Sequence, residues 1–123
     1  MINYLIVSLG AALGGAFRYW LSGVIQKYFP ASFPYGTLTV NVAGSLLLGI
    51  IIFIIDSRQM ISHQTKIFLT IGFCGGFTTF STFSFETINL IKHSEFFLAF
   101  INIMLNVVLC LGAVYAASLF THK

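Results

Sequence analysis

Residues 72–86 read GFCGGFTTFSTFSFE, and this segment sets the architecture of the whole chain. It combines a glycine pair, hydroxyl side chains that alternate with phenylalanines, and one carboxylate, all inside a longer apolar region. A helix that faces lipid has no need of so many hydroxyl groups, and an acidic residue inside a membrane is costly. The segment therefore predicts that a membrane span of this protein handles something polar, and that phenylalanine takes part.

The composition is that of a membrane protein. Of the 123 residues, 58% are hydrophobic and 7% are charged, and the mean hydropathy is +0.96. A soluble domain carries about 25% charged residues, so we expect a single membrane-embedded domain over residues 1–123. The six Lys and Arg residues are scattered and form no basic patch, which argues against nucleic-acid binding. The sequence offers no acid pair, Ser-His-Asp set or phosphate-binding loop, so an enzyme is not expected.

Four segments are long and apolar enough to cross a bilayer, which takes about 20 residues of helix. We expect them at residues 4–25, 36–55, 66–91 and 96–120. Pro30 and Pro34 end the first segment, and short polar links separate the others. The predicted fold class is an all-α membrane protein with four transmembrane helices per subunit.

The loop charges give little preference for one orientation in the membrane. One side would hold three Lys or Arg residues and the other two: Arg58, Lys66 and Lys123 against Lys27 and Lys92. The positive-inside rule needs a clear excess of such residues to set an orientation. This balance predicts insertion both ways up and an antiparallel, dual-topology homodimer with a two-fold axis in the membrane plane. The alternative is that a small bias or the insertion machinery selects one orientation.

Gly75 and Gly76 fall in the middle of the third predicted span. Glycine there either breaks the helix, which leaves backbone carbonyls without helical partners, or lets an unbroken helix pack closely against another. Thr78 and Thr79 follow directly, and their hydroxyls can satisfy freed backbone groups, which favours the break. We therefore predict a third helix that is broken at mid-membrane depth, with freed carbonyls that suit a hard cation.

The phenylalanines after the glycine pair follow a helical spacing. Phe80 and Phe83 share a face, and Thr79, Thr82 and Glu86 lie beside them. The edge of a benzene ring is positive, so ring edges and hydroxyl donors together can face a small anion without the fixed charge that would trap it. The alternative is that these rings are ordinary membrane packing. The repeated hydroxyls favour the first interpretation, since packing against lipid does not need them.

Three further polar residues lie inside the predicted spans. Asn41 is near the start of the second span, where its amide can donate to an anion or bond a neighbouring helix. Arg18 lies toward the end of the first span, where it either lines a water-filled vestibule or extends to the membrane interface. Glu86 lies near the end of the third span, which predicts that its carboxylate faces water in the same vestibule.

The fourth span carries a polar stripe. Asn102, Asn106 and Cys110 recur at a spacing of four residues, so they share one face of a helix and form a candidate second wall of a polar path. Cys74 and Cys110 lie in apolar segments without CxxC or Cys/His spacing. We expect both thiols to act as small buried hydrophobic groups rather than as disulfide or metal sites.

Three motifs together resemble the CrcB/Fluc family of fluoride channels: GGAFRY at residues 14–19, GTLTVNVAG at 36–44 and GFCGGFTTFSTFS at 72–84. The resemblance runs in order along nearly the whole chain. It implies a four-span protein that forms an antiparallel dimer with two pores in the plasma or inner membrane of a prokaryote. The implied function is passive, selective export of F⁻, which protects the cell from fluoride toxicity. The implied partners are fluoride, membrane lipid and a second copy of the chain.

The resemblance also assigns roles to individual residues. It implies that Phe80 and Phe83 are the pore phenylalanines, and that the pore amide and the polar track beside the rings are Asn41, Thr79, Ser81 and Thr82. It implies vestibule positions for Arg18 and Glu86, and it implies that the backbone carbonyls of Gly75 and Thr78 from both subunits hold a structural Na⁺. In the fourth span some members carry a tyrosine, where this chain has Met104 between Asn102 and Asn106.

Two other classes of membrane protein compete with this interpretation. A small multidrug-type transporter is also a four-span, dual-topology protein, but it needs an acidic residue in its first span to exchange protons for cations. The first span here has Arg18 as its only charged residue, which is the wrong sign. A non-transporting membrane assembly subunit would explain the glycines and the apolar bulk, but it gives no reason for the alternation of phenylalanine and hydroxyl residues.

Overall fold

The computed structural model describes residues 1–120, and within them every regular element is helical. The elements are α1 (Ile2–Lys27), α2 (Tyr35–Gly49), the π-helical η1 (Ile50–Ile55), the 3-10 helix η2 (Asp56–Arg58), α3 (His63–Ile67), the π-helical η3 (Phe68–Cys74), α4 (Gly75–Phe77), α5 (Phe80–Lys92) and α6 (Phe96–Ser118). Lys123, which entered the prediction of topology, lies outside the described residues.

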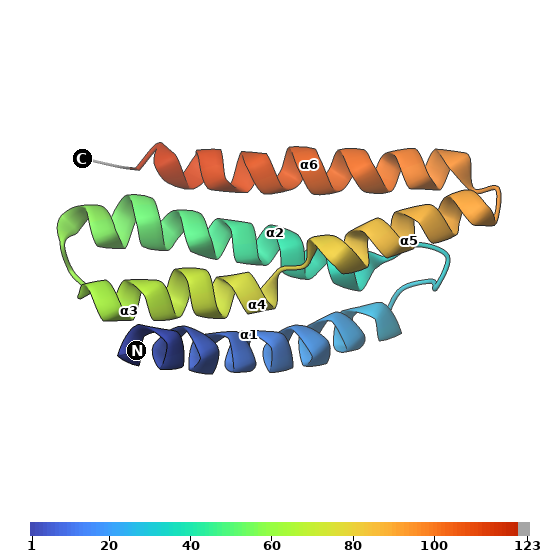
Figure 1. Ribbon diagram of the computed structural model, residues 1–123. Helices are drawn as coiled ribbons and strands as arrows, with labels where there is room; N and C mark the ends of the chain where they lie inside the picture. Colours follow the sequence, from blue (N-terminus) through green and yellow to red (C-terminus); the bar gives the residue numbers. More distant parts are fainter. Residues whose placement is uncertain (121–123) are drawn as a thin grey trace.

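Among the described residues, four helical stretches are long and apolar enough to cross a membrane: Ile2–Lys27, Tyr35–Arg58, His63–Lys92 and Phe96–Ser118. The prediction of an all-helical chain with four spans is therefore confirmed, and the ends of the spans differ from the predicted ones by no more than three residues. The first span begins, and the fourth ends, at the same end of the bundle (Figure 1), as an even number of spans requires.

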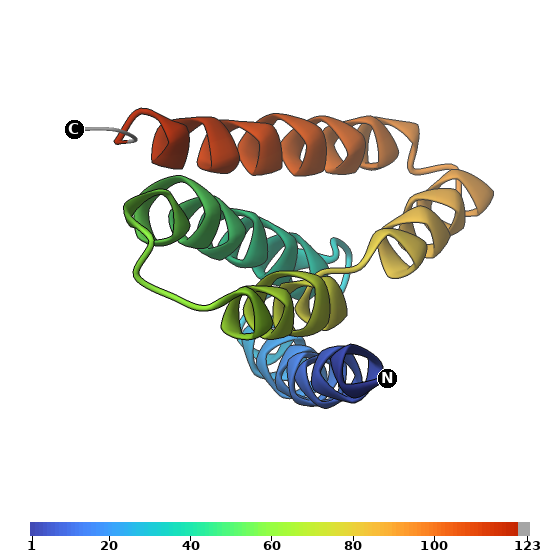
Figure 2. The ribbon, with the colours of Figure 1, turned by 60° about the vertical axis from the view of Figure 1, so that its left-hand side comes forward.

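The helices are stacked so that α1 and α6 lie on opposite sides of the bundle, with α2, α3 and α4 between them (Figures 1 and 2). The principal contacts of α1 are with η3 and α4, and those of α2 are with α6. Figure 2 shows that α5 leaves the line of α4 and extends toward α6, so the two halves of the third span lie against different neighbours.

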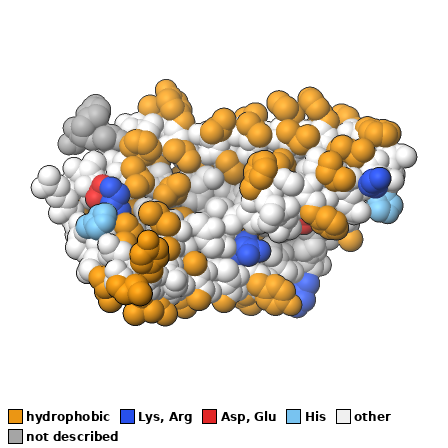
Figure 3. Space-filling model, viewed as in Figure 1, with side chains coloured by type: hydrophobic (Ala, Val, Ile, Leu, Met, Phe, Trp, Pro, Cys, Tyr) orange, Lys and Arg blue, Asp and Glu red, His pale blue; other side chains and the backbone are white. Residues whose placement is uncertain are grey.

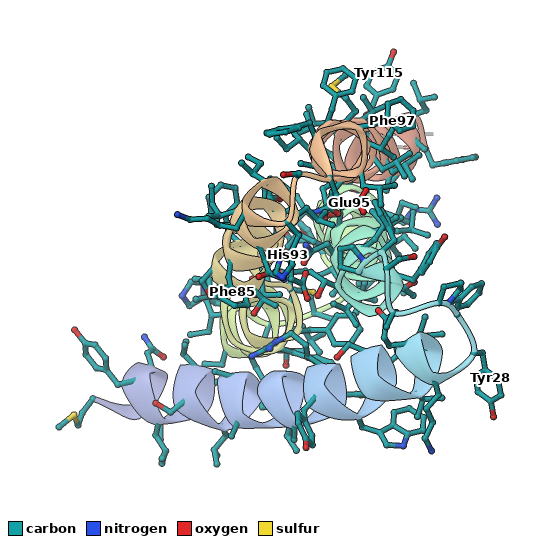
Figure 4. All side chains as sticks on the ribbon, turned by 90° about the vertical axis from the view of Figure 1, so that its right-hand side faces the viewer. Tyr28, Phe85, His93, Glu95, Phe97 and Tyr115 are labelled. Atoms are coloured by element: carbon teal, nitrogen blue, oxygen red, sulfur yellow. The ribbon has the colours of Figure 1, made fainter. Side chains whose placement is uncertain are left out.

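On the face shown in Figure 3, hydrophobic side chains are spread along the length of the bundle. Figure 4 shows Phe97 and Tyr115 pointing outward from α6, and 73% and 66% of their surfaces are exposed. Exposed aromatic side chains of this kind are typical of a surface that faces lipid rather than water.

Glycines allow α1 to lie directly against the third span. A Cβ atom on Gly10 would lie 2.5 Å from the carbonyl oxygen of Phe68, and one on Gly76 would lie 2.5 Å from that of Ala11. Real Cβ atoms do not approach this closely, so both positions require glycine for the observed packing. Small residues that bring helix backbones together are a common packing device in membranes.

The chain leaves the helical conformation at two threonines rather than at the glycine pair. Gly75 has helical angles, with φ −62° and ψ −38°, and Gly76 lies within α4. Thr78 and Thr79 are extended, with φ −91°, ψ 163° and φ −152°, ψ 122° respectively. The prediction located the interruption at the glycines, but both glycines are helical and the extended residues follow at Thr78 and Thr79. Of the pair, Gly76 serves close packing against α1.

Candidate functional site

The extended residues border a pocket of about 330 Å³ that is partly open to the surface of the subunit. Its lining comes from α2, from the 78–83 segment and from α6: Asn41, Ser45, Thr78, Thr79, Phe80, Phe83, Asn106, Val107, Cys110 and Leu111. Five of the predicted pore residues therefore lie together here. Ser81 and Thr82 lie on the first turn of α5 outside this lining.

Asn41 holds the extended backbone in place. Its Oδ1 accepts a hydrogen bond from the N–H of Thr79 at 2.8 Å, and its Nδ2 donates to the carbonyl of Thr79 at 3.1 Å. Nδ2 also donates to Oδ1 of Asn106 on α6 at 3.0 Å. The amide of Asn41 is buried and bonds two neighbouring segments, which is the second of the two alternatives that the sequence left open.

The extended residues divert the N–H groups of the third span away from their helical acceptors. In a continuous helix the N–H of Thr79 would donate to the carbonyl of Gly75, and that of Thr82 to the carbonyl of Thr78. Here the N–H of Thr79 donates to Asn41, and that of Thr82 donates to Oγ1 of Thr79 at 3.1 Å, which caps α5. The carbonyls of Gly75 and Thr78 thereby lose their helical donors.

Gly75 and Thr78 also line a second, smaller pocket of about 140 Å³. The other lining residues are Gly44, Ser45, Leu48, Thr70 and Cys74. Carbonyl and hydroxyl oxygens are the ligands that hard cations prefer. Within residues 1–120 there is no group of three or more His, Cys, Asp or Glu side chains that could hold a metal ion.

Phe80 and Phe83 lie side by side on the first turn of α5, with ring centroids 5.4 Å apart and ring planes at 52°. Phe83 is buried, whereas 78% of Phe80 is exposed in the single subunit. Thr79 and Ser81 flank Phe80 in the chain, and their hydroxyl oxygens are 3.4 Å apart. An aromatic pair beside a row of hydroxyls is the arrangement that the repeat in the sequence predicted.

Arg18 reaches from α1 to the end of α4. Its Nε donates to the carbonyl of Gly76 at 2.9 Å. That carbonyl would accept from Phe80 in a continuous helix, so the guanidinium replaces a helical bond that the extended residues remove. A vestibule and the membrane interface were the two expected positions of Arg18, and its contact with α4 was not among them.

Glu86 is half-buried and bonds α2. Its Oε2 accepts from Oγ1 of Thr37 at 3.0 Å, while its Oε1 is buried with no hydrogen-bond partner among the described residues. Thr37 was not among the predicted site residues. A signal was present, because Thr37, Asn41 and Ser45 recur at a spacing of four residues and form a polar stripe on α2.

The two asparagines of the fourth span occupy different environments. Asn106 lines the large pocket and is bonded to Asn41, whereas Asn102 is 1% exposed and lies behind the pocket lining. Cys110 lines the pocket with a half-buried thiol, and Cys74 is buried. The predicted stripe therefore exists, but only part of it reaches the pocket.

Four apolar membrane-length helices, with extended backbone inside the third span and a pocket beside it that apolar and polar residues both line, define a small multi-pass membrane protein. The chain belongs to the family of CrcB-like proteins, described as "CrcB-like protein, Camphor Resistance (CrcB)", whose sequence profile matches residues 5–118. This finding confirms the resemblance that the motifs indicated, and it agrees with the prediction that the chain is not an enzyme.

Individual relatives match over almost the whole chain. The fluoride-specific ion channel FluC of Paramagnetospirillum magneticum is 42% identical over 117 residues, which cover 94% of this chain and 91% of that protein. FluC of Clostridium novyi is 46% identical over 114 residues, covering 93% and 89%. FluC of Geobacter metallireducens is 43% identical over 115 residues, covering 94% and 93%.

Proposed function

We propose that this protein is a passive fluoride channel of the prokaryotic cell membrane that exports F⁻ and so limits its toxicity. The observation that carries the proposal is the pocket at residues 78–83, where an aromatic pair and polar groups lie together within an apolar bundle. Relatives that match more than nine-tenths of the chain at 42% identity or more are named fluoride-specific ion channels, which supports the same function.

The chemistry of the pocket suits a small anion. The positive edges of the rings of Phe80 and Phe83 attract an anion without binding it as tightly as a fixed cation would. The hydroxyl of Thr79 in the pocket lining, and those of Ser81 and Thr82 on the adjoining turn of α5, can replace water as hydrogen-bond donors. Conduction needs sites that bind strongly enough for the ion to enter and weakly enough for it to leave, and rings with hydroxyls meet both conditions.

The proposed channel is an antiparallel homodimer. In the single subunit the pocket is partly open to the side, Phe80 is 78% exposed, and Gly75 is exposed in the middle of a span. Backbone away from helical geometry is stable at membrane depth only where protein or water covers it, so a second copy is the natural cover for residues 75–80. The balanced loop charges support opposite orientations of the two copies.

The proposed function includes a break of the third span at Thr78 and Thr79 that serves a structural Na⁺. The carbonyls of Gly75 and Thr78 fit such an ion, because their helical donors are bonded to Asn41 and to Oγ1 of Thr79. Two-fold symmetry would bring the same carbonyls from each subunit. When bound, the ion supplies a fixed positive charge that joins the subunits and offsets the negative carbonyl dipoles.

Efflux from liposomes tests the function directly. Purified protein in liposomes loaded with KF and KCl should release F⁻ when valinomycin balances the charge, and should retain Cl⁻. Liposomes without protein, and liposomes without valinomycin, are the controls. Release of both anions alike, or of neither, would contradict the proposal. Labelling of a tag after the C-terminus from both sides of the membrane tests dual insertion separately, and labelling from one side only would contradict it.

A further inference from the structure

A continuous chain of hydrogen bonds leaves the 78–83 segment and returns to it through two other helices. The N–H of Thr79 donates to Oδ1 of Asn41 at 2.8 Å, and Nδ2 of Asn41 donates to Oδ1 of Asn106 at 3.0 Å. Nδ2 of Asn106 donates to Oδ1 of Asn102 at 3.0 Å. The last two links are from Nδ2 of Asn102 to Oγ1 of Thr87 at 3.0 Å, and from Oγ1 of Thr87 to the carbonyl of Phe83 at 2.8 Å.

All the links point in one direction, and the two ends determine that direction. A backbone N–H can only donate and a backbone carbonyl can only accept, so Thr79 begins the chain and Phe83 ends it. Reversing any one amide would set two NH₂ groups, or two carbonyl oxygens, against each other. Each asparagine therefore has a single satisfactory orientation. Bonds aligned in this way strengthen one another in a medium of low dielectric constant.

The two ends of the chain enclose the aromatic pair. Thr79 precedes Phe80 directly, and the carbonyl that ends the chain belongs to Phe83. Asn102 and Thr87, which make the return links, are 1% and 6% exposed, and neither lines the pocket. These two side chains therefore act on the pocket only through the residues they bond.

We propose that Asn102 and Thr87 are positioning residues, which hold the first turn of α5 so that the rings of Phe80 and Phe83 face the ion pathway. This inference rests on the proposed fluoride channel. It gives Asn102 a role behind the pathway instead of the wall position that its stripe suggested. Thr87 and Asn102 thereby connect the carbonyl of Phe83, through Asn106, to the amide of Asn41 that bonds the backbone of Thr79.

A matched pair of substitutions at Thr87 tests the proposal. Thr87→Val keeps the shape but removes the hydroxyl, whereas Thr87→Ser keeps the hydroxyl. We expect Thr87→Val to reduce the rate of F⁻ efflux by about tenfold, the change that follows from loss of about one buried hydrogen bond, and Thr87→Ser to stay near the wild-type rate. Thr39→Val is the control, since Oγ1 of Thr39 also donates to the carbonyl four residues earlier, Tyr35, at 2.8 Å.

A combined variant separates positioning from general stability. If Thr87 acts through the rings, Thr87→Val in a Phe83→Ile background should cause little further loss, because effects within one connected unit are not additive. A general loss of stability would lower the rate by the same factor in both backgrounds. Size-exclusion chromatography of each variant measures how much folded protein enters the assay. Thr87→Ala, which also lacks the hydroxyl, replaces Thr87→Val if the latter is not recovered as folded protein.

The outcomes distinguish this inference from the function on which it rests. Wild-type protein that releases no F⁻ overturns the proposed channel and the inference with it. Wild-type protein that releases F⁻, with Thr87→Val and Thr87→Ser indistinguishable, overturns the inference alone. Equal factors of loss in the wild-type and Phe83→Ile backgrounds also overturn it, and they assign Thr87 a purely structural role.

Discussion

Replacement of Asn41 by alanine should both destabilise the protein and impair its transport. The substitution removes three hydrogen bonds and leaves the N–H of Thr79, the carbonyl of Thr79 and Oδ1 of Asn106 without these partners. A buried polar group without a partner costs about 1–3 kcal/mol of stability. Three such groups would lower the free energy of unfolding by about 3–9 kcal/mol at most.

The lower bound comes from measurements on hydrogen bonds between membrane helices. These average about 0.6 kcal/mol each, so three of them contribute about 2 kcal/mol. We therefore expect Asn41→Ala to lower the free energy of unfolding by at least about 2 kcal/mol. The loss should be accompanied by slower F⁻ efflux, because the extended backbone at Thr79 is no longer held against α2.

Titration with SDS in mixed micelles, followed by circular dichroism, measures this free energy. Asn89→Ala is the matched control, since Asn89 is an exposed asparagine on α5, in the third span. It should change the unfolding free energy by less than about 0.5 kcal/mol, as exposed substitutions usually do. An Asn41→Ala protein as stable as the Asn89→Ala protein would refute the role assigned to the Asn41 amide.

Three further predictions concern packing, turns and the cap on α4. Gly10→Ala should destabilise the protein by about 1–3 kcal/mol through overpacking, whereas Gly23→Ala should be tolerated because no atom lies within 4 Å of the added Cβ; SDS titration of the pair checks this. Ser94→Gly should stabilise the turn between α5 and α6 by about 1 kcal/mol, since Ser94 has φ 60°, and efflux should not change. Arg18→Met should lower the free energy of unfolding by about 1–3 kcal/mol, because it leaves the Gly76 carbonyl at the end of α4 without its donor. An unchanged unfolding midpoint would contradict the capping role of Arg18.

Much of the fold could be predicted because the membrane restricts the choices. A span needs about 20 apolar residues with every backbone group bonded internally, so the hydropathy pattern was sufficient to locate all four helices. The pocket residues were also predictable, because a repeat of phenylalanine and hydroxyl residues has no use in a lipid-facing helix. The motifs of the family include Asn41, Thr78, Thr79, Phe80 and Phe83, which line the pocket.

The position of the extended residues could not be predicted from local sequence. A glycine pair permits either a break or a close helix contact, and only the tertiary packing of α1 shows that Gly76 serves the contact. The bond from Arg18 to Gly76 joins residues 58 positions apart, so no sequence spacing reveals it. The orientation of the asparagine amides depends in the same way on three helices meeting at one place.

The central claim is that the pathway carries fluoride passively and in preference to chloride. The most direct test is the reversal potential of the protein in a planar bilayer with a tenfold gradient of F⁻ and an equal concentration of Cl⁻ on both sides. For a fluoride-selective channel, the reversal potential of the current should be about 59 mV in magnitude, with the sign that the F⁻ gradient sets for a permeant monovalent anion. A reversal potential near zero, or no current at all, would contradict the claim.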